Sequence, residues 1–343
     1  MLDNINNTPI TYFFRNHRSG FSIYKAISPI VKDCDKIYIV PKYRGDILSV
    51  LTNMLFARRH FNRNGINHVT GDVHYLVLAM LGCKTVLTIH DMVAVKTASN
   101  PIKKALLKWL WFKLPLRFAD RITCISESTK KQLLENFKIK SEALTVIYDP
   151  LDPMFEYHPK EFDKINPRIL HVGTGWNKNL LRVIKALKGI KCKLVIVGKI
   201  DEEQRAAIKA SSIDFENYVG LSDERIYEEY CKCDIVSFPS IYEGFGMPII
   251  EGMGTGRVVV TSDVEPMNEV AGRAACLVVP TDVESIRNGF IRVIFDDEYR
   301  DSLIKKGLEN VNRFKKERII EEYNKVYNSL LWLVCFRRMF ISY

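Results

Sequence analysis

The sequence has no long run of uncharged apolar residues. A membrane-spanning helix needs about 20 such residues in succession, and no stretch of the 343-residue chain approaches that length. The opening residues 1–7 are polar and do not form the basic, apolar and small-residue pattern of a signal peptide. We therefore expect a protein that stays in the cytoplasm.

The cysteines are too scattered along the sequence to form a disulfide framework. Of the 8 cysteines, only Cys231 and Cys233 are close together, and this spacing matches neither a disulfide scaffold nor a Cys-x-x-Cys zinc site. The Asp-x-Asp pattern of residues 33–35 falls between a predicted helix and a predicted strand, so we interpret it as a solvated turn. We expect buried thiols in a reducing compartment and no bound metal.

Nucleic-acid-binding motifs are also absent, although the net charge is +10. Residues 1–150 hold 22 Lys and Arg against 11 Asp and Glu, whereas residues 151–343 hold 28 against 29. No zinc finger, RNA-binding sheet motif or helix-turn-helix pattern accompanies this surplus, so we expect no nucleic acid partner. The remaining interpretations are a solvated basic face and an anionic membrane surface.

Short apolar runs alternate with longer amphipathic segments, which predicts a parallel α/β architecture. A proline-rich polar stretch divides the chain. The predicted parts are an N-terminal domain over 1–150, a linker over 151–167, a C-terminal domain over 168–320, and a last helix or tail over 321–343 that crosses back to the first domain or contacts a membrane. Strands are predicted over 10–14, 37–40, 85–89, 122–125, 144–147, 168–172, 193–197, 234–238, 258–261 and 275–279. This pattern predicts two doubly wound sheets that face a cleft, with ligands bound beyond the carboxyl ends of the strands.

A glycine-rich turn lies between the predicted strand 234–238 and a helix that we expect to begin near Ile249. Gly244 and Gly246 allow positive φ and close backbone approach, and the N-terminus of the following helix attracts an anion. Phosphate is the anion that we expect this turn to bind. Glu243 lies in the turn and Glu251 about two turns into the helix, so that one carboxylate could face the reacting end of a ligand and the other its hydroxyl-rich middle.

This stretch resembles the signature of the family 4, group 1 retaining glycosyltransferases of the GT-B fold. The shared pattern is Pro-Ser-x-Tyr-Glu-Gly-Phe-Gly-x-Pro over 239–248, followed by a second glutamate at Glu251. The resemblance covers roughly residues 85–325. It implies two Rossmann-like domains, a donor sugar at Glu243, and nucleotide ribose hydroxyls at Glu251. The turn residues that would bind the donor are Gly244, Phe245, Gly246 and Met247.

The turn after the strand 168–172 is similar to the family's diphosphate-binding turn. There the resemblance assigns Gly173 and Thr174 to the donor and Lys178 to its diphosphate. Asn177 stands where the family commonly has an arginine, so we assign the second cation to Lys199. A nicotinamide site is not expected here, because a third glycine is missing and the next strand ends in Gly198-Lys199 without an acidic residue.

Four further residues are candidates for the site. Backbone groups around Val219 and Leu221 would hold the nucleobase, which leaves uracil and guanine undistinguished. His90, at the carboxyl end of the strand 85–89, would contact the donor sugar or the reacting region. Gly20 lies in a loop with nearby arginines that either contacts phosphate or acceptor, or simply begins a helix.

The predicted reaction is metal-independent transfer of a sugar from a nucleotide-diphospho-sugar to a hydroxyl, with retention of configuration and no cofactor besides the donor. His90, Lys178 and Glu243 are the catalytic candidates. The acceptor would be a saccharide or a polyprenyl-diphosphate-linked saccharide of surface polysaccharide or lipopolysaccharide synthesis. The alternatives are a nucleotide-sugar epimerase of the same fold and a non-catalytic nucleotide-sugar-binding protein.

Two basic, aromatic segments add a prediction about the membrane. Residues 103–113 and 330–341 combine Lys or Arg with Trp, Leu and Phe, and both are too short and too charged to span a bilayer. Their alternative interpretations are packing into the N-terminal domain and a final helix that crosses back to it. Together with the basic N-terminal half, they predict a peripheral enzyme at the inner face of the membrane.

Overall fold

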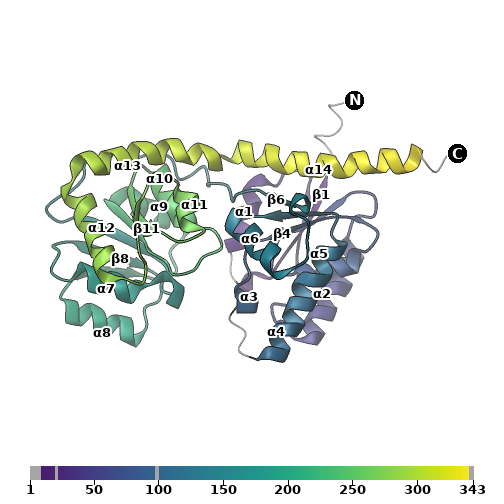
Figure 1. Ribbon diagram of the computed structural model, residues 1–343, viewed down its shortest axis with the longest axis horizontal. Helices are drawn as coiled ribbons and strands as arrows, with labels where there is room; N and C mark the ends of the chain where they lie inside the picture. The colour runs from purple at the N-terminus through teal and green to yellow at the C-terminus, as the bar shows by residue number, and fades with distance from the viewer. Residues whose placement is uncertain (1–8, 20–21, 97–99, 340–343) are drawn as a thin grey trace. The chain divides into compact units, whose positions relative to one another are not determined.

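Two parallel β-sheets organise the chain (Figure 1). The computed structural model describes residues 9–19, 22–96 and 100–339. The chain forms two compact units, the first made of residues 1–150 and 316–343 and the second of residues 151–315. The predicted α/β class, with a doubly wound sheet in each half, is confirmed.

The first sheet has the strand order β2-β1-β3-β4-β5-β6, and every neighbouring pair is parallel. Its strands are β1 (Ile10–Phe14), β2 (Lys36–Ile39), β3 (Ile66–Val69), β4 (Lys84–Ile89), β5 (Arg121–Cys124) and β6 (Leu144–Val146). Since β1 pairs with both β2 and β3, the strand order reverses between β1 and β3. The loops that follow these two strands therefore flank the topological switch point.

Helical elements cover both faces of this sheet. One face packs against α2 (Ile47–His60), η3 (His74–Met80), the π-helix η4 (Lys108–Lys113), α5 (Leu114–Phe118) and α6 (Glu127–Asn136). The other face packs against α1 (Ser22–Ile27) and the final helix α14 (Lys316–Met339). Two short helices, α3 (Val93–Lys96) and α4 (Pro101–Leu107), precede η4. In Figure 1, α14 is the yellow helix beside β1.

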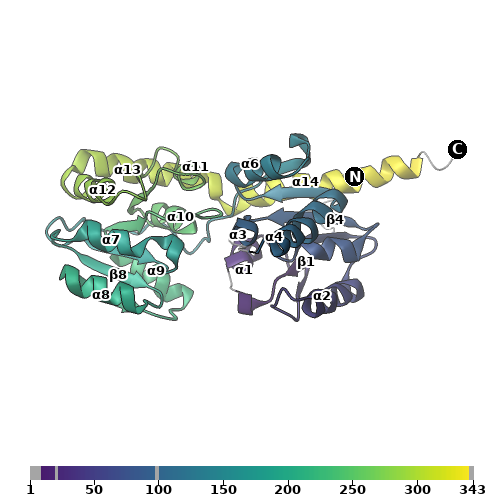
Figure 2. The same cartoon turned by 60° about the horizontal axis from the view of Figure 1, so that its bottom comes forward.

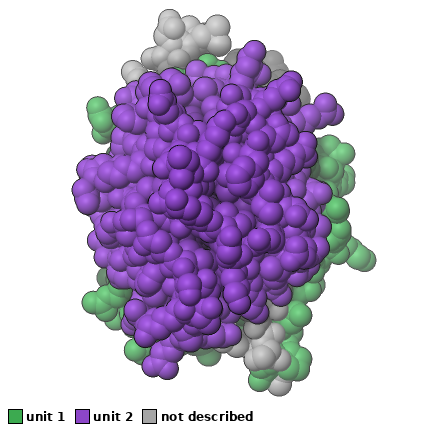
Figure 3. Space-filling view, turned by 90° about the vertical axis from the view of Figure 1, so that its left-hand side faces the viewer, with its two compact units in different colours: residues 1–150, 316–343 green, residues 151–315 purple. Residues whose placement is uncertain are grey.

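The second sheet has the order β12-β11-β10-β7-β8-β9. Its strands are β7 (Arg168–Val172), β8 (Lys193–Val197), β9 (Asp214–Tyr218), β10 (Ile235–Phe238), β11 (Val258–Ser262) and β12 (Cys276–Val278). Its helices are α7 (Leu180–Leu187), α8 (Glu202–Ser211), α9 (Asp223–Lys232), α10 (Met247–Gly254), α11 (Met267–Ala271), α12 (Val283–Phe295) and α13 (Asp297–Asn310). Figure 2 shows these helices on both sides of the sheet, and Figure 3 shows one face of residues 151–315.

Some elements differ from the sequence-based prediction. Strands β3 and β9 were not predicted. Helix α10 begins at Met247 rather than near Ile249, because Pro248 fits the first turn of a helix, where no backbone N–H is needed. Residues 151–167, predicted as a linker, pack on the second unit, where Phe155 is buried against Tyr230.

Asp149, which ends the first pass of the chain through the first unit, gives a prediction about pH. Its side chain is buried, and burial raises the pKa of its carboxyl to about 7. The pKa of an aspartate in an unfolded chain is about 3.9. The folded state therefore favours the proton, and stability is greatest below ~4, declines as the pH rises towards 7, and stays low above it.

We expect Asp149→Asn to stabilise the protein at pH 8 by up to ~4 kcal/mol and to have little effect at pH 4. Thermal unfolding at both pH values measures the difference. Asp33→Asn, which removes an exposed carboxylate, is the matched control, and its change in Tm should be small. An equal change in Tm at both pH values for the Asp149 variant would rule out this account of the site.

Among the described residues, no helix combines the length and the apolar character that a bilayer-spanning segment needs.

Candidate functional site

The candidate site of the second unit lies at the switch point of its sheet. Strand β7 pairs with both β8 and β10, so the strand order reverses between β7 and β10. The loops after these two strands, residues 173–179 and 239–246, therefore lie side by side beyond the carboxyl ends of the strands. Both loops carry residues that the sequence analysis selected.

Lys178 and Glu243 form an ion pair between the two loops. The Lys178 Nζ lies 2.8 Å from Glu243 Oε1, and both side chains are mostly buried. The ammonium also lies 4.6 Å from the centre of the Phe238 ring, at the end of β10. A partly desolvated ammonium in this position can stabilise negative charge more strongly than an exposed lysine could.

Two asparagines hold the loops together. Asn177 Nδ2 donates to Glu243 Oε1 at 3.1 Å and to the Tyr242 carbonyl at 3.0 Å. Asn179 has a left-handed backbone with φ of 66°, and its Nδ2 donates to the carbonyls of Pro239 and Pro280. Asn177 thus helps to orient Glu243. Asn177 itself stands at the position where the family pattern commonly has an arginine.

Gly173 and Thr174 line the first loop. Gly173 has φ of +94°, and a Cβ there would lie 2.9 Å from Lys178 Cε, so glycine leaves room for the lysine stem. Thr174 Oγ1 donates to the Lys199 carbonyl at 2.6 Å, and Gln204 Nε2 donates to the Thr174 carbonyl at 2.8 Å. The loops after β7 and β8 are therefore fastened together, with the Lys199 side chain exposed.

The second loop leads directly into α10. Gly246 has φ of +120°, a conformation that favours glycine, and no side chain caps the helix there. Gly244 and Met247 are partly exposed. The Phe245 ring is buried edge-to-face against Phe314, so its role near a ligand would be limited to its backbone.

Glu251 is held by a tyrosine that the sequence analysis missed. Glu251 lies in the second turn of α10 and is partly buried. The hydroxyl of Tyr230, a fully buried residue of α9, donates to Glu251 Oε2 at 2.6 Å. Burial raises the pKa of Tyr230 well above its usual value, so the hydroxyl keeps its proton and orients the carboxylate. No feature of the sequence around Tyr230 indicated this contact.

Val219 and Leu221 follow β9 at the edge of the same sheet. The Val219 side chain is exposed and that of Leu221 is partly exposed, with Gly220 between them at φ of +72°. The loop after β9 therefore continues the row of carboxyl-end loops that begins at β10. The structure places these residues in the second unit, together with Lys178, Lys199, Glu243 and Glu251.

His90 belongs to the first unit, directly after β4. It is buried, and its Nε2 lies 2.8 Å from the Thr70 carbonyl in the loop after β3. Nε2 therefore carries a proton and donates. Burial lowers the pKa of His90 to about 4, so the ring is neutral at pH 7 and can donate a hydrogen bond but is a weak acid. An Arg15–Asp72 ion pair joins the loops after β1 and β3, which flank the switch point of the first sheet. Gly20 lies outside the described residues.

Ser126, after β5, has a capping role. It is the N-cap of α6, and its Oγ accepts a hydrogen bond from the Thr129 N–H at 3.1 Å. Within the part of the chain that the structure describes, no cluster of three or more His, Cys, Asp or Glu side chains is placed to hold a metal ion.

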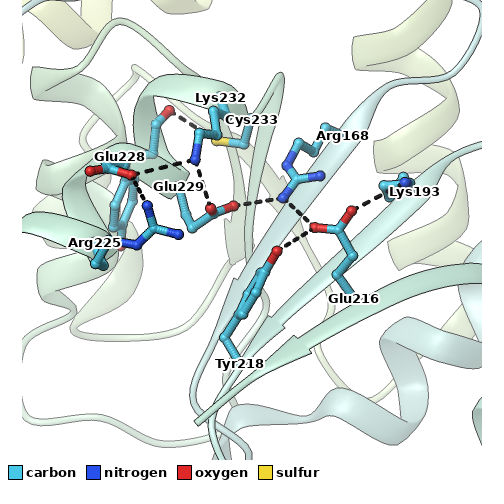
Figure 4. A network of polar contacts seen from close by, with 10 residues as sticks. Arg168, Lys193, Glu216, Tyr218, Arg225, Glu228, Glu229, Lys232 and Cys233 are labelled. Carbon is cyan, nitrogen blue, oxygen red and sulfur yellow. Dashed lines mark hydrogen bonds and ion pairs between the residues drawn. The ribbon is translucent and has the colours of Figure 1, made fainter. Parts of the chain in front are cut away.

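A second group of charges in this unit lies near the start of β7, away from the candidate site (Figure 4). Arg168 Nη2 contacts Glu216 Oε2 at 2.6 Å and Glu229 Oε2 at 2.7 Å, which joins β7 to β9 and α9. Lys193 contacts Glu216, and Lys232 contacts Glu229. Because each carboxylate shown has a cationic partner, we interpret this group as structural.

Two family models match the chain. The model described as Glycosyltransferase Family 4 matches residues 24–155, and the model described as Glycosyl transferases group 1 matches residues 166–296. Together the two matched ranges include His90, Lys178, Glu243 and Glu251, each within the unit that carries it.

Two curated relatives are 26–27% identical to this chain over the aligned residues. The O-antigen chain mannosyltransferase RfbU of Salmonella typhimurium is 27% identical over 207 residues, which is 58% of this chain and 58% of that protein. The N-acetylgalactosamine-N,N'-diacetylbacillosaminyl-diphospho-undecaprenol 4-alpha-N-acetylgalactosaminyltransferase of Campylobacter jejuni is 26% identical, and the match covers 72% of this chain and 71% of that protein. The chain thus spans little more than half of the Salmonella relative.

Solved structures share the fold. Sucrose-phosphate synthase from Thermosynechococcus elongatus superimposes with a TM-score of 0.79 at 18% identity, covering 95% of this chain and 100% of that chain. WaaG, a glycosyltransferase involved in lipopolysaccharide biosynthesis, superimposes with a TM-score of 0.69 at 11% identity, covering 93% and 99%. At these identities the likeness supports the GT-B fold alone, and the predicted fold class is confirmed.

Proposed function

The chain belongs to the family 4, group 1 glycosyltransferases, and we propose that it transfers a sugar from a nucleotide-diphospho-sugar to a hydroxyl with retention of configuration. In this reaction the bond between the anomeric carbon and the diphosphate oxygen breaks, and a bond to the acceptor oxygen forms on the same face of the sugar while the acceptor hydroxyl gives up its proton to the departing diphosphate. Negative charge develops on the departing diphosphate. The observation that carries the proposal is the Lys178–Glu243 pair at the switch point of the second sheet.

Lys178 and Glu243 are complementary in charge, and the proposal assigns each of them a contact with the donor. Lys178 would move its ammonium from Glu243 to the diphosphate as charge develops, with Lys199 as the second cation. Glu243, still held by Asn177, would then be free to contact the donor sugar. Glu251, oriented by Tyr230, would accept hydrogen bonds from the ribose hydroxyls. Electrostatic stabilisation by fixed groups of this kind is a large contribution to catalysis.

The acceptor class is proposed from the relatives. The Salmonella relative is an O-antigen chain mannosyltransferase, and the Campylobacter relative is named for a diphospho-undecaprenol substrate. We propose a saccharide or polyprenyl-diphosphate-linked saccharide acceptor in surface polysaccharide or lipopolysaccharide synthesis. A peripheral position at the inner face of the cytoplasmic membrane would bring the enzyme to such an acceptor.

A panel of nucleotide sugars tests the proposed function. Purified protein is incubated with UDP- and GDP-linked hexoses, with and without lipid-linked saccharide acceptors, and the released nucleotide and the products are separated by mass. Transfer, or slow donor hydrolysis without acceptor, is the expected result. Interconversion of donors without acceptor would instead identify an epimerase, and binding without turnover would identify a non-catalytic protein.

Metal independence is a prediction of the lysine-based mechanism. If Lys178 and Lys199 stabilise the diphosphate, a chelator such as EDTA should leave the transfer rate unchanged to within about twofold. The measurement is the initial rate before and after chelation, with magnesium and manganese added back. Loss of transfer that either metal restores would show that the two lysines are not sufficient.

Glu251→Ala should act mainly on donor binding. Loss of a charge-assisted hydrogen bond costs ~1.5–3 kcal/mol, so KM for the donor should rise by about tenfold or more while kcat changes little. Tyr230→Phe, which removes the hydroxyl that orients Glu251, should change KM in the same direction by a smaller factor. Wild-type KM in the Glu251 variant would exclude its assigned role.

A further inference from the structure

Trp176 lies in the loop after β7, two residues before Lys178, and the reaction described above gives it no role. It is the first residue of the short 3₁₀ helix η6 (Trp176–Lys178). Trp176 is 67% exposed, although tryptophan is on average one of the more buried residues. In the part of the chain that the structure describes, its indole has no hydrogen-bond, stacking or cation–π partner. Water solvates an apolar ring poorly, so a ligand that covers the indole would gain free energy.

The neighbours of Trp176 hold it in this exposed position. A Cβ on Gly175 would lie 3.0 Å from Asn177 Oδ1, so glycine leaves room for the Asn177 amide that orients Glu243. The Lys178 N–H donates to the Gly175 carbonyl at 2.8 Å, which closes the turn around Trp176. The Asn177 carbonyl accepts from a backbone N–H of the loop after β10, also at 2.8 Å. Trp176 is therefore displayed by a turn that is fastened on both sides.

The geometry of η6 separates the directions of Trp176 and Lys178. A 3₁₀ helix has three residues per turn, so successive side chains leave its axis about 120° apart. Lys178 reaches across to Glu243, while Trp176 leaves the same turn toward solvent. Consecutive Cα atoms are about 3.8 Å apart, so the Cα atoms of Trp176 and Lys178 are at most about 7.6 Å apart. The indole thus borders the position that the proposed function assigns to the diphosphate.

Retaining transfer puts the acceptor sugar next to the same diphosphate. The new bond forms on the face of the donor sugar from which the diphosphate departs, so the attacking hydroxyl and the departing oxygen are neighbours. The ring that carries this hydroxyl therefore lies beside the group that Lys178 contacts. A pyranose ring has an apolar face of C–H groups, while most of its hydroxyls project from its edge. Such a face can stack on an indole and remove apolar surface from water.

We propose that Trp176 is a stacking platform for the sugar ring of the acceptor and thereby helps to select the acceptor. The inference rests on the retaining transfer given under the proposed function, and it places part of the acceptor contact in the second unit. Stacking needs an uninterrupted C–H face. Trp176 therefore favours acceptor rings that present such a face and disfavours rings with an axial hydroxyl on it.

Acceptor kinetics test the platform. The donor found in the panel is combined with a soluble saccharide acceptor, and wild-type protein is compared with Trp176→Ala and Trp176→Phe. Trp176→Ala should raise KM for the acceptor about tenfold or more, and Trp176→Phe about threefold, because a smaller ring still stacks. KM for the donor should stay within about twofold of the wild-type value. A raised donor KM with an unchanged acceptor KM would overturn the proposal, because the indole would then serve the donor.

Phe295→Ala is the matched control. Phe295 is 70% exposed and belongs to the same unit, but it is the last residue of α12 and lies outside the loops at the switch point. Its removal should leave both KM values within about twofold of wild type. Thermal unfolding shows that the variants are folded, since substitutions at exposed positions change stability little. An acceptor KM in Trp176→Ala no higher than that in Phe295→Ala would contradict the platform.

Saturation-transfer NMR separates this proposal from the proposed function, because it needs no turnover. The probes are the methyl glycosides of glucose, galactose and mannose, with UDP or GDP present. At least one probe should show saturation of its ring C–H protons with wild-type protein and with Phe295→Ala, and lose most of it with Trp176→Ala. Glu243→Gln should keep the signal, since Glu243 is assigned to the donor sugar.

The outcomes of the NMR experiment are distinct. A signal that survives in Trp176→Ala, a signal that disappears in Glu243→Gln, or no signal with wild-type protein would each overturn the platform. If the expected pattern holds while no protein turns over any donor, the platform stands as a saccharide site and the enzymatic assignment fails. If transfer is observed with a wild-type acceptor KM in Trp176→Ala, the platform fails and the enzymatic assignment stands.

Discussion

Lys178→Ala is expected to lower kcat/KM for the nucleotide-sugar donor by about 100-fold, through both a lower kcat and a higher KM. The ammonium is the group that would meet the charge developing on the diphosphate. Its removal also leaves the Glu243 side chain, which is only 13% exposed, without its cationic partner and with the hydrogen bond from Asn177. The measurement is steady-state kinetics with the best donor found in the panel.

Lys185→Ala is the matched control for this prediction. Lys185 lies on α7, a few residues after Lys178, and its side chain is exposed. Its removal should leave kcat/KM within about twofold of the wild-type value. Glu243→Gln separates the two members of the pair, because it removes the carboxylate while Lys178 remains. Wild-type kinetics in the Lys178 variant would remove the central electrostatic step from the mechanism.

Arg168→Met should destabilise the second unit by about 3 kcal/mol, because it leaves a buried carboxylate without its main partner. Glu229 has a side chain that is 3% exposed, and in the variant its remaining contact is Lys232 at 3.2 Å (Figure 4). Glu216 would lose the guanidinium that holds its pKa down to about 2. Methionine fills a similar volume, so that the change is mainly one of charge.

Arg225→Met supplies the control within the same group of charges. The Arg225–Glu228 pair is exposed on both sides, and such pairs contribute at most about 1 kcal/mol. Chemical denaturation measures both variants, and hydrogen exchange at β7, β8 and β9 localises the effect to the strands that Arg168 connects. Equal destabilisation by the two substitutions would show that burial of Glu229 does not determine how much stability is lost in the Arg168 variant.

Much of the fold could be predicted because strands in the centre of a parallel sheet are apolar on both faces. Strands β8, β10 and β11 are of this kind. Strand β3 escaped prediction because it buries Asn67 and His68. Asn67 is satisfied by the backbone of Asn62, and His68 lies 2.9 Å from the Tyr327 hydroxyl on α14. A buried histidine whose partner comes from the far end of the chain has no local sequence signal.

Strand β9 was missed for a different reason. Its residues, Asp214–Tyr218, are mostly polar, and it is the edge strand of its sheet. Glu216 there is compensated by Arg168 and Lys193, which come from two other strands. Local polarity therefore indicated a loop, while ion pairs formed in the folded state allowed a strand.

The candidate site was predictable to the level of loops. A glycine-rich turn between a strand and a helix is a local pattern, so the positions of Glu243 and Gly246 followed from the sequence. The contacts that orient the site did not, since Asn177–Glu243 and Tyr230–Glu251 join different elements. Sequence reasoning named the charged groups, and the structure added the polar side chains that hold them.

The anomeric configuration of the product tests the central claim most directly. Protein is incubated with a donor whose sugar is α-linked to the diphosphate and with a saccharide acceptor, and the new linkage is determined by proton NMR from its anomeric coupling constant. The wild-type enzyme should give an α-linked product, and Lys178→Ala should give the same product more slowly. A β-linked product from the wild-type enzyme would contradict retaining transfer by this site.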